Sequence, residues 1–333
     1  MSVVDRVADV EVGDNLTLLV LDNLVWPILV VTFLAFSAVL PESFLTVSNI
    51  RFLLLSSAAL GTLALAESIC LLSGHFDLSI GSLAGFSAMV TGLFMAQWFP
   101  GTPGVVGIGV IVLVGALLGL LNGVSVAYLG VNPFLQTLAF LIIFRGATIA
   151  ASTYPITDVP ESYQYPGGGE LLPGVPVAVV VLLALFAVAA FLLKYRPFGL
   201  AVYAVGGNER ASQEAGIDTA RVVLAVYVVS GALAGVSGLL YTGFLGAATP
   251  SLGDGALFPA FAAAVIGGIS IFGGRGNILG ALGGVLLLGT IQAGLVMLDI
   301  QPTVIRMTNG VILLAAILLY TGIERYRKRA LQV

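Results

Sequence analysis

The sequence predicts an all-α polytopic membrane protein, with about ten transmembrane helices in two inverted units. Of its 333 residues, 59% are hydrophobic and 9% are charged, and the mean hydropathy is +1.09. Soluble globular domains do not have this balance. The apolar runs are long and continuous, whereas a transmembrane β-barrel would show short alternating segments. We therefore expect a multi-pass protein of the cell (inner) membrane, surrounded by the lipid bilayer.

Long apolar segments divide the chain into spans. The segment before them, 1–23, is polar and acidic, unlike the basic start of a signal peptide. Residues 24–322 form a single transmembrane domain, and 323–333 form a basic tail. The expected spans are roughly 24–40, 53–72, 79–97, 105–128, 133–152, 174–193, 222–246, 258–272, 277–297 and 303–322.

The distribution of basic residues predicts the orientation. An even number of spans places both termini on the same side of the membrane. With the termini inside, only Arg51 falls in an exterior segment. Positive charge favours the cytoplasmic side, so both termini are predicted to be cytoplasmic. The basic residues of the interior segments are Arg6, Lys194, Arg196, Arg210, Arg221, Arg275, Arg325, Arg327, Lys328 and Arg329.

The order of the spans also predicts an inverted repeat. Spans two to five enter from outside and spans seven to ten from inside, which gives two four-span units of opposite orientation. The second span of each unit is interrupted. SGHFDLSIGS (73–82) introduces one, and the other lies between PSLGDG (250–255) and FGGRGN (272–277). Interrupted segments in corresponding positions often mark a transport pathway. The chain also has 42 glycines, many of them within spans, where they let helix backbones approach closely.

The longest polar interior loop, 194–221, is expected to contain a short helix. Pro197 and Gly199 interrupt the preceding apolar run. Asn208 is a good N-cap, and Gly216 stands where a left-handed cap would end a helix of about two turns. The pattern predicts a helix over 208–215, preceded by an apolar segment at 198–205. On these residues alone, a docking surface and a solvated connector are equally compatible with the loop.

Catalytic and metal-binding motifs receive little support. Cys70 and His75 are single residues of their types, which makes a His/Cys metal site very unlikely, and no cofactor is expected. A Walker A loop ends in Gly-Lys-Ser/Thr, but the two lysines, Lys194 and Lys328, are followed by Tyr195 and Arg329. The chain is therefore not a P-loop ATPase by itself. No nucleic-acid partner is expected.

Two charged residues fall within spans, Glu67 and Arg145. A charge at the centre of a lipid-exposed helix costs about 2.5–3.5 kcal/mol, so each should face a cavity or a partner. Glu67 either lines a pathway or forms a structural hydrogen bond with a neighbouring helix. Arg145 either faces inward or reaches toward the exterior headgroups, with the second favoured.

Other polar residues accompany them. Asp77 and Ser79 stand at the start of the span at 79–97, where capping of helix N–H groups is favoured over substrate contact. Asn132 followed by Pro133 predicts a capped helix start. The polar residues Asn122, Gln136, Asn277 and Gln292 are neutral, and a path lined by neutral hydrogen-bonding groups suits a neutral polyhydroxy solute better than an ion. The predicted path residues are Glu67, Asp77, Ser79, Asn122, Gln136, Arg145 and Gln292.

Four stretches in series resemble the ribose-type permeases of ABC importers. GHFDLSIGS (74–82) is similar to their G-x-D-L-S-x-G-S signature, and NGVSVAYLGVNPFLQTLAFLIIFRGA (122–147) to their N-G … P-x-F-x-x-T-L … R-G segment. FGLAVYAVGGNERASQEAGI (198–217) resembles their cytoplasmic loop, and VIGGISIFGGRGNILGALGG (265–284) the segment that follows. The resemblance covers roughly residues 45–325. His75 stands where the family usually has glycine, which leaves the local turn geometry open.

This resemblance implies a transmembrane permease subunit of an ATP-binding-cassette importer for a monosaccharide, a ribose-like pentose or a hexose. It implies a vitamin B12-importer-like arrangement of ten spans, a second permease copy in a homodimer, a cytoplasmic ABC ATPase and an extracytoplasmic solute-binding protein. The predicted short helix would be the coupling helix that sits in a groove of the ATPase. The ATPase-coupling residues would be Gly207, Asn208, Glu209, Arg210, Ala211, Glu214, Ala215, Gly216 and Ile217.

The main alternative is a secondary carrier with inverted repeats, driven by an ion gradient through Glu67. A membrane-embedded enzyme is a weaker third possibility, since catalytic constellations are missing from the sequence. Neither the solute nor the number of ATPase chains is specified by the residues.

Overall fold

The computed structural model describes residues 23–330. The expected N-terminal segment therefore lies outside the described residues except for its last position, as do residues 331–333 of the basic tail. The elements are α2 (Val25–Val39), α3 (Val47–Leu72), α4 (Ile80–Leu93) with a π-helical turn (Phe94–Trp98), α5 (Gly104–Ala127), α6 (Pro133–Ala151), α7 (Glu161–Gly168), β1 (Glu170–Leu172), β2 (Val175–Pro176), α8 (Val177–Tyr195), α9 (Pro197–Gly207), α10 (Glu209–Glu214), α11 (Thr219–Leu245), α12 (Leu257–Ile266), α13 (Ile278–Met297) and α14 (Pro302–Ala330).

Every expected span corresponds to a helix, but the lengths differ. In the described part of the chain, eight helices are long and apolar enough to cross a membrane. The other two, α2 and α12, have 15 and 10 residues. The eighth span was expected to continue to 272, which is wrong. The helix ends at Ile266 because Gly267 caps it and Gly268 takes a positive φ of 87°.

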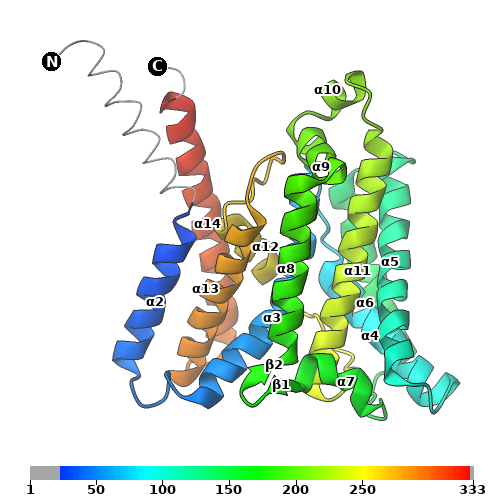
Figure 1. Ribbon diagram of the computed structural model, residues 1–333, viewed down its shortest axis with the longest axis vertical. Helices are drawn as coiled ribbons and strands as arrows, with labels where there is room; N and C mark the ends of the chain where they lie inside the picture. Colours follow the sequence, from blue (N-terminus) through cyan, green and yellow to red (C-terminus); the bar gives the residue numbers. More distant parts are fainter. Residues whose placement is uncertain (1–22, 331–333) are drawn as a thin grey trace.

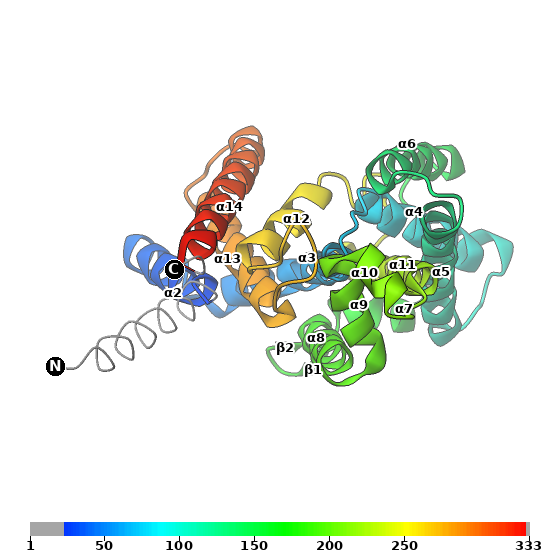
Figure 2. The same ribbon diagram turned by 90° about the horizontal axis from the view of Figure 1, so that it is seen from above.

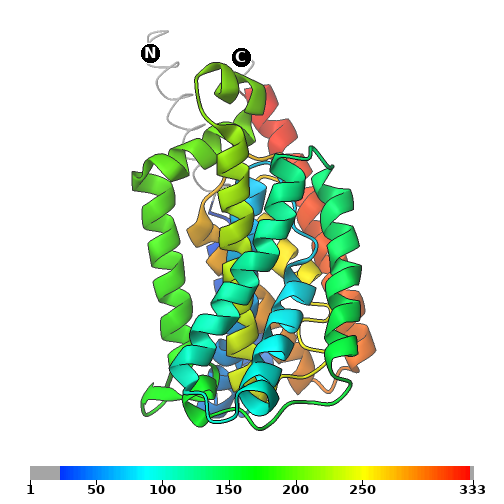
Figure 3. The same ribbon diagram turned by 90° about the vertical axis from the view of Figure 1, so that its right-hand side faces the viewer.

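The long helices form a bundle with two distinct ends (Figure 1). The start of α2, the end of α14 and the short helix α10 lie at one end, which we call the α10 end. Helix α7 and the β1–β2 hairpin lie at the other, the α7 end. A view turned by 90° shows α8, α11, α5 and α6 extending between these two ends (Figure 3). Within the described residues, the start of α2 and the end of α14 thus lie toward the same end of the bundle, and the side of the membrane on which the termini lie stays a prediction.

The helices pack in a reciprocal pattern that fits two related units, α3–α6 and α11–α14. In each unit the second helix packs against the fourth, α4 on α6 and α12 on α14. Between units the first helix packs against the third, α11 on α5 and α3 on α13. Seen from above, α3 lies near the middle, α11 lies beside α5, and α14 and α6 lie toward opposite sides (Figure 2). Because α3 and α11 run in opposite directions, the pattern agrees with an inverted repeat.

Glycines set the distance between α5 and α11, the pair with the most extensive contact. A Cβ atom on Gly231 would lie 2.3 Å from the carbonyl oxygen of Gly115, which is closer than real Cβ contacts. The same holds within the second unit at Gly284 of α13, where a Cβ would lie 2.1 Å from the Ala263 carbonyl oxygen of α12. The expected role of span glycines in close packing is therefore confirmed at these positions.

The connection from α6 to α8 is folded, which the sequence did not predict. Ile156 and Ala248 form an antiparallel bridge, with N–H to carbonyl distances of 2.9 and 3.0 Å. The α7 side chain of Tyr163 is fully buried. Arg51 at the start of α3 pairs with Glu170 of β1 at 2.9 Å. These contacts fasten the connection across the α7 end of the bundle.

Candidate functional site

A buried polar cluster lies where α3, α5 and α11 meet the α3–α4 connection. Its members, all buried, are Glu67, Asp77, Ser79, Asn122 and Ser230. The Asp77 carboxylate accepts hydrogen bonds from the Ser79 hydroxyl at 2.6 Å and the Ser79 N–H at 3.0 Å. Asn122 donates to the Ser79 hydroxyl at 2.8 Å and reaches Asp77 at 3.5 Å, while Ser230 reaches Asp77 at 3.4 Å. Asp77 therefore connects two long helices to the interrupted segment.

Helix capping, the favoured role of Asp77 and Ser79, is only partly correct. Ser79 occupies the N-cap position of α4, but its side chain forms no capping bond. Asp77 accepts the N–H of Ser79, which precedes the helix. The Asp77 and Ser79 side chains face each other and Asn122 instead, because α5 supplies an amide donor here. An exposed helix start has no such donor beside it. By contrast, Asn132 caps α6 as expected, accepting from the N–H groups of Phe134 and Leu135.

Glu67 is fully buried on α3, and neither carboxyl oxygen has a hydrogen-bond partner. The sequence left open a structural hydrogen bond to a neighbouring helix, and none is present. The carboxyl instead lies beside the carboxyl and backbone N–H of Asp77. The Asn122 amide oxygen in the same cluster also lacks a partner.

His75 and Gly74 form the turn that precedes the cluster. Gly74 takes the positive φ of 79°, so the non-glycine residue at 75 adopts an ordinary conformation. The His75 Nδ1 lies 2.8 Å from the Ser73 carbonyl oxygen. Burial lowers the pKa of His75, partly opposed by the Ser73 hydrogen bond and the nearby Glu209 charge. The imidazole is therefore neutral near pH 7, and the histidine fits where glycine was expected.

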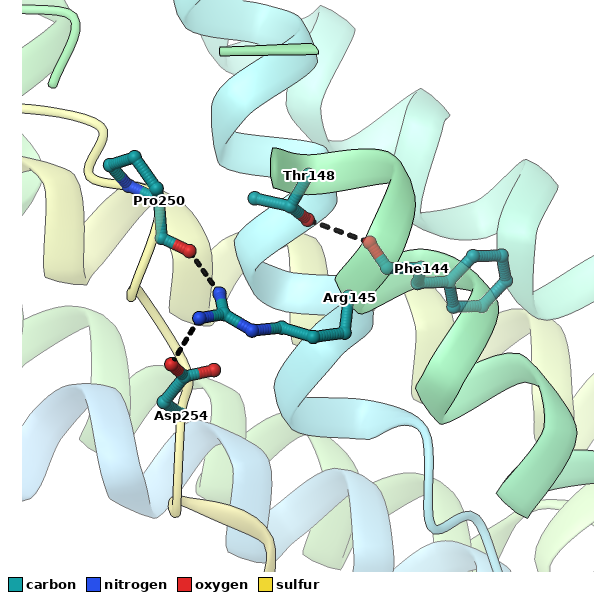
Figure 4. Close-up of polar contacts among 5 residues, drawn as sticks. All are labelled: Phe144, Arg145, Thr148, Pro250 and Asp254. Atoms are coloured by element: carbon teal, nitrogen blue, oxygen red, sulfur yellow. Dashed lines mark hydrogen bonds and ion pairs between the residues drawn. The ribbon is translucent and has the colours of Figure 1, made fainter. Parts of the chain in front are cut away.

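Arg145 does not reach toward headgroups, which was its favoured role. Its guanidinium pairs with the Asp254 carboxylate at 2.6 Å and donates to the Pro250 carbonyl oxygen. Figure 4 shows both contacts extending from α6 to the connection before α12. Arg145 thus links the last helix of one unit to the interrupted segment of the other, through the PSLGDG stretch.

Two of the predicted path residues belong neither to the buried polar cluster nor to the contacts of Arg145. Gln136 on α6 is half-buried, and Gln292 on α13 is exposed. The structure therefore brings together four predicted path residues in the buried polar cluster and places Arg145 separately. Neutral amides in spans are weak sequence signals, since they occur on outer faces too.

Helix α10 is the short capped helix expected in the long polar loop. The Asn208 side chain accepts the N–H of Ala211 at 3.0 Å, and Gly216 takes a φ of 86°. Of its six residues only Ser212 is buried. Behind it, the half-buried Ile217 packs against the apolar cluster of Val126, Val205, Val223 and Tyr227. The helix is anchored at Ser212 and on its C-terminal side, and its other five residues are exposed.

A backbone junction, formed by Gly74, Gly206, Gly273 and Gly274, lies beneath α10. The N–H of Gly274 donates to the Leu72 carbonyl at 2.9 Å. A Cβ on Gly206 would lie 1.9 Å from that same carbonyl oxygen and 2.6 Å from the Gly274 nitrogen. Tyr203 of α9 donates to the Gly276 carbonyl at 2.9 Å. The end of α9 therefore rests directly on the end of α3 and on the α12–α13 connection.

Comparison with known proteins identifies the family. Residues 49–319 match the family described as "Branched-chain amino acid transport system / permease component". The chain belongs to this permease family. It is 35% identical to the D-allose transport system permease protein AlsC of Escherichia coli, over 88% of this chain and 89% of that protein. It is 36% identical to the ribose import permease protein RbsC of Bacillus subtilis, over 85% and 87%. The L-arabinose ABC transporter permease protein AraH of Azospirillum brasilense is 32% identical, over 92% and 89%. No solved structure matches the chain.

Sequence reasoning missed several residues of this permease. Ser230 and Tyr227, whose hydroxyl donates to the Phe76 carbonyl at 2.8 Å, lie on α11 far from the segment they contact. Asp254 and Tyr203 were also missed. Asp254 stands in the interrupted PSLGDG stretch and carries the charge opposite to that of Arg145. The pair could therefore have been predicted, because an arginine within a membrane span needs an acidic partner. A lone serine or tyrosine in an apolar helix gives no comparable signal.

Proposed function

We propose that this chain is the membrane-spanning permease subunit of an ATP-driven importer for a monosaccharide. Its relatives are permeases for D-allose, ribose, L-arabinose and fructose. They are matched over most of their length, which favours the same role here over an ion-gradient-driven carrier. The substrate class is a pentose or hexose. The chain hydrolyses no ATP itself, in keeping with the lack of a Gly-Lys-Ser/Thr sequence in its 333 residues.

The observation that carries this proposal is the exposed helix α10 on its backbone junction. In this proposal α10 is the coupling helix and seats in a groove of a cytoplasmic ABC ATPase. The groove would contact the exposed positions Glu209, Arg210, Ala211 and Glu214. ATP binding and hydrolysis move the helix, and α9 passes the movement to α3 and to the α12–α13 connection. A single movement of α10 would thus reach both units through α9.

The orientation and the other partners follow from the same proposal. The α10 end faces the cytoplasm, as the distribution of basic residues favours. The α7 end receives an extracytoplasmic solute-binding protein. Two copies of the permease assemble as a homodimer, with ten spans each in an arrangement like that of vitamin B12 importers.

The proposal is tested by purifying the permease with the ATPase and binding protein encoded beside it. ATP hydrolysis is then measured in nanodiscs with binding protein that carries ribose, allose, arabinose or fructose. We expect one loaded sugar to stimulate hydrolysis above the unloaded binding protein. A permease that binds no ATPase and moves solute down an ion gradient would overturn the proposal.

A further inference from the structure

The buried polar cluster contains more hydrogen-bond acceptors than its own donors satisfy. Both oxygens of Glu67 and the amide oxygen of Asn122 are buried and form no hydrogen bond of good geometry, although the backbone N–H of Asp77 lies beside the Glu67 carboxyl. The side-chain donors that are present, the Ser79 and Ser230 hydroxyls and the Asn122 amide nitrogen, are already directed at Asp77 and Ser79. Buried polar atoms in native proteins are normally paired, so three orphaned acceptors in one place require an explanation.

The cluster also contains two acids without a basic partner. Glu67 and Asp77 lie side by side and fully buried. Neither takes part in the ion pairs found among residues 23–330, which join Arg51 to Glu170, Arg145 to Asp254, Arg210 to Glu214 and Arg221 to Asp218. Two adjacent buried carboxylates repel each other and are costly to desolvate, so the folded state gains by taking up positive charge there.

The neighbouring titratable groups offer no such charge. The Cys70 thiol lies near the Ser230 hydroxyl, one helical turn beyond Glu67. The Tyr227 hydroxyl is committed to the Phe76 carbonyl at 2.8 Å. Both are neutral near pH 7. Nor does the described part of the chain hold three or more His, Cys, Asp or Glu side chains placed to bind a metal ion. A transition-metal site is therefore disfavoured. Ca²⁺ needs about six to eight oxygen ligands and Mg²⁺ a full octahedral set, more than this cluster supplies, which favours a small monovalent cation.

We propose that Glu67, Asp77 and Asn122 bind a small monovalent cation, Na⁺ or a proton, inside the membrane domain. Na⁺ would take its oxygen ligands from the orphaned acceptors. A proton would reside on Glu67 and be donated to a neighbouring acceptor oxygen. Either cation removes the repulsion between the acids and joins α3, the α3–α4 connection and α5. The site is independent of the proposed sugar transport, because the fold alone places these residues together.

The test is thermal unfolding of the full chain, purified in detergent, as the cation is varied. One series replaces choline chloride by NaCl at constant ionic strength, and a second raises the pH from neutral to alkaline at constant salt. Binding to the folded state raises the unfolding midpoint with cation concentration. We expect the midpoint to rise with NaCl if the cation is Na⁺. We expect it to fall with rising pH, without a response to NaCl, if the cation is a proton.

Two glutamine variants assign the response. Glu67→Gln removes one buried charge at nearly constant shape and should abolish or strongly reduce the response. Glu170→Gln, which breaks the surface pair with Arg51, should retain it. A wild-type midpoint that responds to neither NaCl nor pH would overturn the inference. The same conclusion would follow if Glu67→Gln responded as wild type does, and the wild-type series remains decisive if this variant does not fold.

Discussion

Arg145 joins the two units through one side chain, since its guanidinium contacts both Asp254 and the Pro250 carbonyl. Its side chain is 32% exposed and that of Asp254 is 44% exposed. Surface ion pairs of this kind contribute no more than about 1 kcal/mol to folding. Its larger effect should be on the position of the connection before α12.

We predict that Arg145→Gln lowers sugar uptake several-fold while the unfolding midpoint changes little. The reason is that the connection before α12 is no longer held against α6 by Arg145, although the surrounding helices remain packed. Uptake in membrane vesicles and thermal unfolding in detergent measure the two effects. The exchange Arg145→Asp with Asp254→Arg should recover part of the uptake. Equal loss in the exchanged variant and in Arg145→Gln would show that the pair has no positioning role.

At the scale of single residues, sequence and structure agree where the local chain decides the outcome. Asn208 and Gly216 bound α10 as expected because a cap depends on residues within one turn. Ser79 was misjudged because its partner, Asn122, is distant in the sequence. Glu67 was recognised as exceptional from its position in an apolar span, but its lack of partners depends on packing that no local pattern encodes.

Among the elements, α9 carries α10, and at Gly206 its backbone lies directly against the end of α3. We predict that Gly206→Ala lowers sugar-stimulated transport at least several-fold, because the added methyl would meet the Leu72 carbonyl oxygen at 1.9 Å. The measurement compares uptake with ATP hydrolysis in nanodiscs, and hydrolysis should fall less than uptake.

Gly109→Ala on α5 is the matched control, since a Cβ there meets nothing within 4 Å. It should leave both activities near wild type. Wild-type uptake in Gly206→Ala would contradict the role of the junction in transmitting movement.

Helix α10 gives a second prediction at this scale. Glu209→Arg combined with Ala211→Asp should abolish transport, because both positions are exposed on the surface proposed to enter the ATPase groove. The permease should still assemble as a dimer, measured by cross-linking and size-exclusion chromatography. Glu42→Arg, an exposed charge reversal in the α2–α3 connection, should retain ATPase binding. Normal transport by the double variant would exclude α10 as the coupling helix.

The whole molecule has a testable orientation. Its single cysteine, Cys70, is fully buried, so the native chain offers no accessible thiol among its described residues. We predict that Glu42→Cys and Glu161→Cys react with a membrane-impermeant maleimide on intact cells, since both lie at the α7 end. Gln213→Cys on α10 should react only after permeabilisation. The reverse pattern would invert the proposed topology.

The overall architecture was predictable because apolar length and charge asymmetry are properties of the sequence alone. The inverted order of units was also expected from the spans, and the packing of α11 on α5 and of α3 on α13 is compatible with it. What could not be inferred is how the units contact each other. The α7 region and the backbone junction depend on contacts between distant segments, and the extent of α12 depends on where Gly267 meets α13.

The interrupted segments of the two units touch without side chains between them. A Cβ on Gly81 of α4 would lie 2.7 Å from the Gly253 carbonyl oxygen, and one on Gly253 would lie 2.0 Å from the Gly81 carbonyl oxygen. Because only backbone atoms meet there, no side-chain rotamer change can absorb a displacement of one segment against the other. A rotation of α4 must displace the segment leading into α12 at once. We therefore expect the two halves of the molecule to move together. A larger side chain at Gly81 or Gly253 should hinder the movement of both.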